Sequence, residues 1–457
     1  MSKYFFEKKQ NPERADWFFI IYSVAVLIYL IAINTQKDST LSIIAAIVVL
    51  PFLFRPEKFL PLVFACAING EFFVAYEGIS MARIYTVVFA AGTLIQIILK
   101  KRKVRWEDIV LYGFFAVFAF ISAGTSYTGD ITAAVSFILY LVMAFSLIYT
   151  PFDRKFFLLS CSLISFILSV YYIVVLASGA GDSFLGRASV SDATNPNPLG
   201  MGIAQLVGFN FAGYFVAEKK LAKLLFVASA ACNITSILFT GSRSALIGAF
   251  GGVVACLILI TFGKSPEIRR INPLAAALFV VGCVIAYFVV LEIDPEVMKR
   301  FTVDNIKESG GTGRVDIWMV TMKKVFPKFP MFGLGFGGAN LSSYLLANYG
   351  IRHGAHNIFV AMISEMGIAG ILIFIPYLIA CYIKIIKTYR FDCSSLIPFT
   401  MLTTIIFNGV GENTFGTRIL WFAVGLCLMI SRQKRENLLP KTRALDVVRT
   451  GRKNEKG

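Results

Sequence analysis

The stretch SALIGAFGGVVACLILITF, residues 244–262, contains no charged residue. A helix of this length crosses a hydrocarbon layer of about 30 Å. Comparable apolar runs recur along the chain at 17–34, 41–54, 59–77, 80–99, 108–125, 131–149, 156–178, 199–217, 221–240, 272–291, 358–386, 396–410 and 415–430. The second run and the last two are short. The sequence therefore predicts an all-α polytopic membrane protein with twelve to fourteen transmembrane helices.

Composition supports this prediction. Of the 457 residues, 57% are hydrophobic and 16% are charged, and the mean hydropathy is +0.72. A soluble domain has about 45–50% apolar and about 25% charged residues. So much apolar surface cannot be buried inside one globule, and a soluble enzyme is excluded.

The net charge of +17 follows from the predicted topology. With a cytoplasmic N-terminus and fourteen spans, 31 of the 44 Lys and Arg residues fall in segments predicted to be inside. These segments are 1–16, 55–58, 100–107, 150–155, 218–223, 263–271, 384–392 and 431–457. The positive-inside rule then predicts that both termini are cytoplasmic. Because the basic residues orient the chain, nucleic acid is not expected as a partner.

Four regions follow from this topology. We expect an N-terminal transmembrane bundle at 1–291, an external loop at 292–357, C-terminal transmembrane helices at 358–430 and a basic cytoplasmic tail at 431–457. No small-residue cleavage site follows the first apolar run, which favours an uncleaved span over a signal peptide.

The external loop contains an amphipathic pattern. One face would carry apolar residues at helical spacing, namely Val315, Trp318, Met319, Met322, Val325 and Phe326. Pro327 and Pro330 end this helix. Such a helix would lie on the outer membrane surface or cap the bundle. A second short helix is predicted at 341–349, with Leu341, Tyr344 and Leu345 on one face.

Thirteen basic residues lie on or near the external side, against the topological bias. Arg243 stands in TGSRS between two apolar runs, where it either anchors a helix end or serves a site. Arg314 opens the amphipathic helix, and a cation at the positive end of a helix fits an anion site. The glycine-rich stretch FGLGFGGAN, 332–340, is weak as a nucleotide motif and is interpreted as a tight turn.

The only two histidines, His353 and His356, form an H-x-x-H pattern. A catalytic zinc needs a third protein ligand, and the neighbouring sequence offers none, so no metal is expected. His356, followed by Asn357, stands where the chain re-enters the membrane. It is the obvious candidate for a general base, and the alternative is a local hydrogen bond at a helix start.

Other polar residues stand at the same predicted face. Arg187 precedes the rigid turn NPNPLG, 195–200, and Glu412 and Arg418 belong to the last external turn. Glu365 lies within a span, where a carboxylate needs a partner. It would pair with Arg418 or form hydrogen bonds within the bundle. Together these residues predict a pocket for a diphosphate or another strong anion at the outer boundary.

Four motifs carry a resemblance to a known family. They are TGSR (240–243), GRVDIW (313–318), the P-x-F-G-L-G-F-G stretch (330–337) and HNIFVAMISEMGIAG (356–370). Together they resemble the signature of the O-antigen ligase and Wzy-type polymerase superfamily. Its members are bacterial inner-membrane enzymes that move polysaccharide units from undecaprenyl diphosphate.

The resemblance implies a glycosyltransferase that inverts the anomeric centre and requires neither metal nor cofactor. Arg243 and Arg314 would hold the donor diphosphate, and His356 would activate or position the acceptor hydroxyl. Arg187, Arg418, Glu412 and Asn357 are the further substrate-binding candidates. The implied partners are an undecaprenyl-diphosphate-linked donor, a glycan acceptor, membrane lipid, a flippase and a chain-length regulator.

Three functions stay open at this stage. The first is a polymerase of lipid-linked repeat units for O-antigen, capsule or exopolysaccharide. The second is a ligase that moves the finished glycan to lipid A core or another terminal acceptor. The third is a transporter of a lipid-linked substrate, which would need polar residues through the full thickness of the bundle.

Overall fold

The computed structural model describes residues 14–36, 39–68, 80–177, 183–184, 187–188, 196–268, 270–274, 277, 281 and 314–433. Within these residues, nine helices are long and apolar enough to cross a membrane. They are α1 (Arg14–Gln36), α4 (Met81–Leu99), α5 (Trp106–Gly124), α6 (Thr132–Tyr149), α7 (Arg154–Ala177), α8 (Pro196–Val216), α9 (Lys220–Thr240), α10 (Arg243–Phe262) and α16 (Ile358–Tyr389). The predicted all-α polytopic fold is confirmed.

Shorter elements complete the bundle. They are α2 (Ser39–Val48), the 3-10 helix η1 (Leu50–Phe54), α3 (Pro56–Ile68), the 3-10 helix η6 (Cys393–Ser395), α17 (Leu396–Asn408) and a last helix at 418–433. The strands β1 (Ser183–Phe184) and β2 (Arg187–Ala188) form a small antiparallel pair. The runs predicted to be short are indeed short here. The predicted span at 272–291 lies largely outside the described residues.

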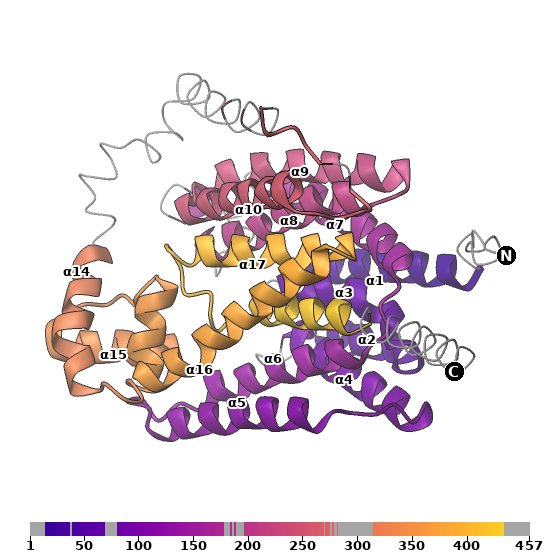
Figure 1. The fold of residues 1–457 in the computed structure, drawn as a ribbon. Helices are drawn as coiled ribbons and strands as arrows, with labels where there is room; N and C mark the ends of the chain where they lie inside the picture. Colours follow the sequence, from indigo (N-terminus) through magenta and orange to yellow (C-terminus); the bar gives the residue numbers. More distant parts are fainter. Residues whose placement is uncertain are drawn as a thin grey trace, which may run out of the picture.

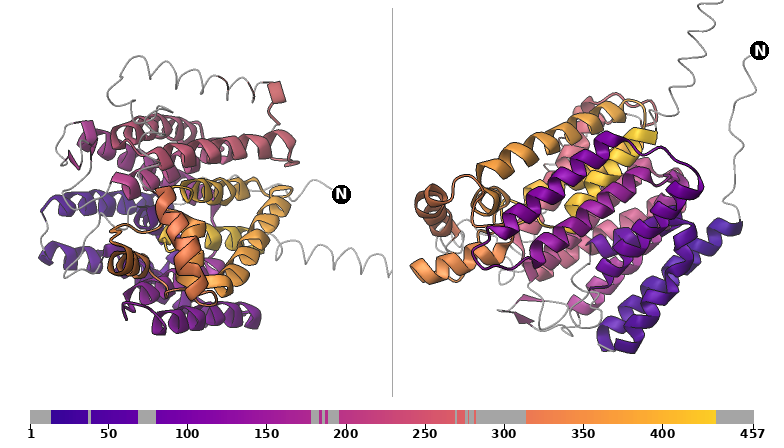
Figure 2. Two further views of the ribbon diagram at one scale, coloured as in Figure 1. Left: turned by 90° about the vertical axis from the view of Figure 1, so that its left-hand side faces the viewer. Right: turned by 90° about the horizontal axis from the view of Figure 1, so that it is seen from below.

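The helices lie side by side, and α14 (Arg314–Val320) and α15 (Gly338–Tyr349) cover one end of the bundle (Figures 1 and 2). We call this the loop end. At the opposite end, ion pairs join Asp16 with Lys58, Lys58 with Asp153, and Asp108 with Arg432. We call this the basic end, because it gathers the described parts of the segments that the sequence predicts to be inside.

Glycines allow α10 to pack closely against α17. A Cβ atom at Gly248 would collide with the side chain of Asn408, and one at Gly252 would collide with Thr404. Helices in lipid gain stability from such close backbone contact, since no hydrophobic force pushes them together. The packing fixes the C-terminal end of α17 at the loop end, directly before the segment that carries Glu412.

Helix α16 has a sharp kink at Gly367, whose φ is 63°. The loop before it replaces the helical hydrogen bonds that the kink breaks. Ile368 N donates to Pro330 O at 2.8 Å, and Ala369 N donates to Met331 O at 3.1 Å. Leu334 N also donates to Ser364 O at 2.8 Å. The glycine-rich stretch is therefore the tight turn that the sequence predicts, and it packs into the bend of a membrane helix.

The amphipathic segment packs on the protein through a line of residues that shares only Val325 with the predicted apolar face. After α14 the chain forms a π-helical turn, η4 (Thr321–Val325), and a 3-10 turn, η5 (Phe326–Lys328). The buried line is Ile317, Thr321 and Val325, whereas the predicted Val315, Met319 and Met322 are exposed. A π-turn has more residues per turn than an α-helix, so residues spaced by four stay on one side. These exposed residues form the side of the helix that faces away from the protein, and its predicted contact with the outer membrane surface stays a prediction.

The second predicted short helix is confirmed as α15. Leu341, Tyr344 and Leu345 are buried, as the sequence pattern indicates. They join Ile317, Val325, Leu334, Ala355 and Ala361 in a small apolar core that is separate from the core of the bundle. This second core holds α14 and α15 against the chain that leads into α16.

Candidate functional site

Four segments meet at the loop end: the start of α10, the start of α14, the residues before α16 and the turn after α17. Gly411 in that turn lies so close to α10 that a Cβ atom there would be 2.6 Å from Ser244 Cβ. The same Cβ would be 3.2 Å from Nη1 of Arg314. Segments far apart in sequence thus enclose a common point, and three of the predicted site residues lie around it.

Arg314 is anchored by the turn after α17. Its Nη1 donates to Gly411 O at 2.7 Å, and its Nη2 lies 3.7 Å from Oε1 of Glu412. The Arg314 side chain is 23% exposed, whereas that of Glu412 is only 11% exposed. A half-buried guanidinium that is oriented on one side retains donors on the other side, which fits the binding of a phosphate.

Glu412 also contacts the histidine. Its Oε2 lies 3.1 Å from Nδ1 of His356. If Nδ1 donates to the carboxylate, Nε2 carries the lone pair and can accept a proton. Such a carboxylate also stabilises the imidazolium that forms after proton transfer. His356, Glu412 and Arg314 therefore form a continuous series of polar contacts.

His356 has an unusual backbone conformation, with a φ of 44°. Left-handed conformations are uncommon for residues other than glycine and persist where surrounding contacts impose them. Here the next two residues are tied to the turn after α17. Ile358 N donates to Gly409 O at 2.7 Å, and Asn357 Nδ2 donates to Val410 O at 3.2 Å.

Asn357 is the N-cap of α16. Its Oδ1 accepts hydrogen bonds from Phe359 N at 2.9 Å and from Val360 N at 3.1 Å. The cap satisfies two backbone donors that a helix start leaves open. With Nδ2 on Val410, the described contacts of Asn357 all lie within the protein and hold His356 against Glu412.

Trp318 connects α14 to the same place. Its Nε1 donates to Ala355 O at 2.6 Å, directly before His356. Because Arg314 lies one turn earlier on α14, this bond sets the distance between the guanidinium and the imidazole. Sequence reasoning missed this contact, because the partner is a backbone carbonyl group.

The remaining predicted site residues lie in different surroundings. Arg243 is half-buried, opens α10 and directly precedes Ser244, which lies against Gly411. Arg187 lies in β2, where it pairs with Phe184, and β2 packs beside α9. Arg418 makes its described contacts elsewhere, because its Nη2 donates to Ser80 Oγ at 3.0 Å.

Glu365 adopts the second of its two predicted arrangements. It does not pair with Arg418 but accepts hydrogen bonds from Gly337 N and from Asn413 Nδ2, both at 3.1 Å. This buried carboxylate thus holds the glycine-rich turn and the residue after Glu412 together. Asn413 was missed by sequence reasoning, since an Asn in a glycine-rich turn has no distinguishing pattern.

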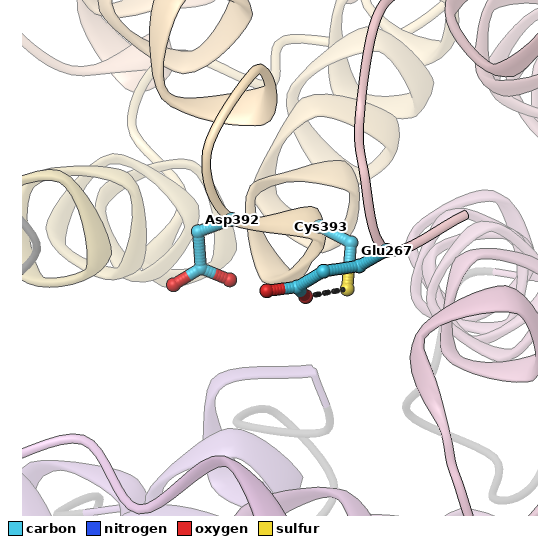
Figure 3. A group of neighbouring side chains, drawn as sticks. All are labelled: Glu267, Asp392 and Cys393. Carbon is cyan, nitrogen blue, oxygen red and sulfur yellow. Dashed lines mark hydrogen bonds between the residues drawn. The ribbon is translucent and has the colours of Figure 1, made fainter. Parts of the chain in front are cut away.

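A group of potential metal ligands lies at the basic end instead. Glu267, Asp392 and Cys393 approach one another, and each offers a ligand atom within 4.8 Å of the others (Figure 3). Arg154 contacts all three. Its Nη1 lies 2.6 Å from Glu267 Oε2, 3.6 Å from Cys393 Sγ and 3.8 Å from Asp392 Oδ1. We interpret this group as an ion-pair cluster that ties loops together.

The fold defines a polytopic, all-α membrane protein with a polar site at one end of its bundle. Residues 228–375 match a family model described as O-antigen ligase. The resemblance inferred from the motifs is thereby confirmed for this region, which includes Arg243, Arg314 and His356. Glu412 lies beyond the matched residues. A search of curated proteins finds no match to the chain.

Proposed function

We propose that the protein is a membrane glycosyltransferase that moves an oligosaccharide from undecaprenyl diphosphate to an acceptor hydroxyl. The observation that carries the proposal is the series of contacts from His356 through Glu412 to Arg314. An imidazole and a guanidinium on one carboxylate support the roles of proton acceptor and diphosphate-binding cation, in a chain with a region similar to O-antigen ligases. We place this site on the external face of the bacterial cytoplasmic membrane, with both termini inside.

The geometry supports a single displacement. The acceptor oxygen attacks the anomeric carbon, and the bond from that carbon to the diphosphate oxygen breaks. Nε2 of His356 takes the proton of the acceptor hydroxyl, and Glu412 stabilises the resulting imidazolium. Arg314 and Arg243 balance the charge that develops on the leaving undecaprenyl diphosphate. Attack opposite the leaving group inverts the anomeric centre.

The acceptor distinguishes two versions of this function. In a polymerase the acceptor is the next lipid-linked repeat unit, and the growing glycan is transferred onto it. In a ligase the acceptor is a terminal one such as lipid A core. The description of the matching family favours the ligase. The polymerase needs only one kind of substrate, because its acceptor is a lipid-linked unit of the same type as the donor.

Mass analysis of products tests the proposal. Purified full-length protein is incubated with a defined undecaprenyl-linked oligosaccharide, with and without a lipid A core acceptor. Longer lipid-linked products support the polymerase, and glycosylated lipid A core supports the ligase. Absence of any new glycosidic bond under both conditions, together with movement of the substrate across vesicles, contradicts the enzyme and favours a transporter.

A further inference from the structure

Arg83 and Arg418 lie at the loop end, apart from the contacts of His356. Both contact α6. Arg418 opens the last helix, and its Nη2 donates to Ser80 Oγ at 3.0 Å. Arg83 lies in the first turn of α4, three residues after Ser80, and its Nη2 donates to Ser136 Oγ at 3.2 Å. The ring of Tyr140, one turn beyond Ser136, lies 5.7 Å from the guanidinium carbon of Arg418.

The charge of this pair has no protein counterpart in the described structure. Among the described residues, no Asp or Glu forms an ion pair with Arg83 or Arg418. Their hydrogen-bond acceptors are neutral hydroxyls. The Nε atoms of both side chains are buried and have no partner in the described part of the chain. Both residues are half-buried, and a cation taken partly out of water in a membrane protein is costly unless an anion accompanies it.

The helix starts add to the positive potential. Both Arg83 and Arg418 stand in the first turn of a helix, where the macrodipole disfavours a cation and favours an anion. Ser80 precedes α4 as its N-cap, but its side chain makes no capping hydrogen bond. It accepts from Arg418 instead. Arg83 and Arg418 therefore lie at the starts of two neighbouring helices. No carboxylate of the described residues forms an ion pair with either of them.

A snorkelling anchor explains these features less well. A snorkelling arginine extends its head into water along an apolar stem. Here both heads are held across helices by serines, and part of each guanidinium is buried. Such fixation orients the remaining donors, and oriented guanidinium forks match the oxygens of a phosphate.

We propose that Arg83 and Arg418 form a second anion site, which takes the diphosphate of a lipid-linked acceptor. The inference rests on the polymerase version of the proposed transfer function. An enzyme that joins two lipid-linked units holds two diphosphates at once, and these repel each other, so each needs its own positive site. Arg314 and Arg243 serve the donor that leaves, and Arg83 and Arg418 serve the acceptor that stays on its lipid.

The first test measures binding. Inorganic pyrophosphate is titrated by calorimetry into the purified full chain in a neutral detergent. We expect two equivalents to bind to the wild type and one to the double variant Arg83→Gln and Arg418→Gln. Glutamine keeps a donor for the serines and removes the charge. Arg352→Gln is the matched control, because Arg352 is an exposed cation in the loop that precedes His356. Two equivalents in the double variant overturn the second site.

Competition identifies the source of the anion. The variant Arg314→Gln removes a cation of the donor site, so the pyrophosphate that it still binds lies in the second site. Undecaprenyl diphosphate should displace this pyrophosphate at concentrations at which phosphatidylglycerol micelles do not. Equal displacement by phosphatidylglycerol assigns the site to a membrane lipid headgroup and overturns its role for the acceptor. Thermal unfolding of each variant, compared with Arg352→Gln, verifies that a lost equivalent reflects the site and not a lost fold.

The second test separates donor from acceptor in the transfer reaction. The acceptor hydroxyl of the donor substrate is blocked, so that this substrate cannot act as an acceptor. The acceptor substrate has a methylene group in place of its anomeric oxygen, so that it cannot act as a donor. In the double variant, KM for the acceptor should rise at least about tenfold while KM for the donor stays unchanged. An acceptor with a neutral linker in place of its diphosphate should bind equally poorly to both proteins.

The outcomes keep the two proposals apart. A rise in the donor KM, or a full effect of the double variant on the neutral acceptor, overturns the acceptor site and leaves the transferase intact. If the wild type binds two equivalents of pyrophosphate but forms no glycosidic bond with any acceptor, the transferase proposal fails and the anion site stands without its assigned substrate.

Discussion

The two ends of this bundle treat positive charge in different ways. At the basic end, Lys58 pairs with Asp16 at 2.6 Å and with Asp153 at 3.2 Å. Arg154 pairs with Glu218 at 2.7 Å and with Glu267 at 2.6 Å. At the loop end, Arg314 lies beside Glu412, which also contacts His356. The comparison teaches that a cation can be held in place by a carboxylate, as Lys58 and Arg154 are, or by a hydroxyl, as Arg83 and Arg418 are.

The largest expected effect comes from removing the shared contacts at the loop end. His356→Ala and Arg314→Ala should each lower transfer by about two to four orders of magnitude, since general-base and charge-stabilising groups contribute on that scale. Product mass spectrometry with the undecaprenyl-linked substrate measures the loss. Arg432→Ala at the basic end serves as the control, since it removes a paired cation. Near-complete activity of the His356 variant would remove its role as the base.

A smaller loss is expected for the carboxylate that His356 and Arg314 share. Glu412→Gln keeps the shape of the side chain but removes the charge that stabilises the imidazolium, so kcat should fall about tenfold to a thousandfold. The pH profile of kcat should change as well, because the acceptor at Nδ1 is altered. Asn413→Ala is the matched control for a disturbed turn. An equal loss in that variant, with an unchanged pH profile, would mean that Glu412 only shapes the turn.

Arg243 tests whether geometry matters at the loop end beyond charge. Arg243→Lys preserves the charge but cannot offer two parallel N–H donors, so we expect about a tenfold to hundredfold lower kcat/KM for the donor. Arg243→Ala should lose at least as much. Steady-state assays at varied donor concentration measure both, with membrane insertion verified by fractionation. Full activity of the Arg243→Lys variant would mean that this position needs only a positive charge and not two parallel donors.

The smallest effect on activity is expected at the basic end. Arg154→Ala leaves Glu218, Glu267 and Asp392 without their common cation, so the midpoint of thermal unfolding should fall while kcat stays the same. Burial raises the pKa of Glu267, but the Cys393 thiol and Arg154 outweigh it and hold that pKa below its usual value. This contribution to stability is therefore present at neutral pH and is lost as the pH falls through about 4 and below. Unfolding scans from pH 7 to pH 3 measure it, and the variant should show a weaker decline than the wild type.

The helices of the bundle were predictable from sequence because each apolar run must match the thickness of the membrane. The buried face of α15 was predictable because the helix is regular. The buried line Ile317, Thr321 and Val325 was not predictable, since the π-turn after α14 changes the spacing of the residues that face the protein. A hydrophobic pattern alone does not reveal such a turn.

The candidate site was predictable only in part. Arg314, His356 and Glu412 stand out as polar residues at the ends of apolar runs, and the structure brings them together. Their mutual order depends on backbone carbonyls, such as those of Gly411 and Ala355, which every residue has. Arg418 illustrates the reverse case, because its place in the sequence beside Glu412 did not indicate its contact with Ser80.

The kink at Gly367 has a consequence for biogenesis. The backbone donors of Ile368 and Ala369 bond to Pro330 and Met331, which are synthesised earlier and stand in the segment between α14 and α15. In its kinked form, α16 can therefore complete its hydrogen bonding only after this earlier segment has folded back onto it. Folding of the loop and completion of the helix become one event, because a kinked α16 without the loop would keep two unsatisfied amide groups in the membrane.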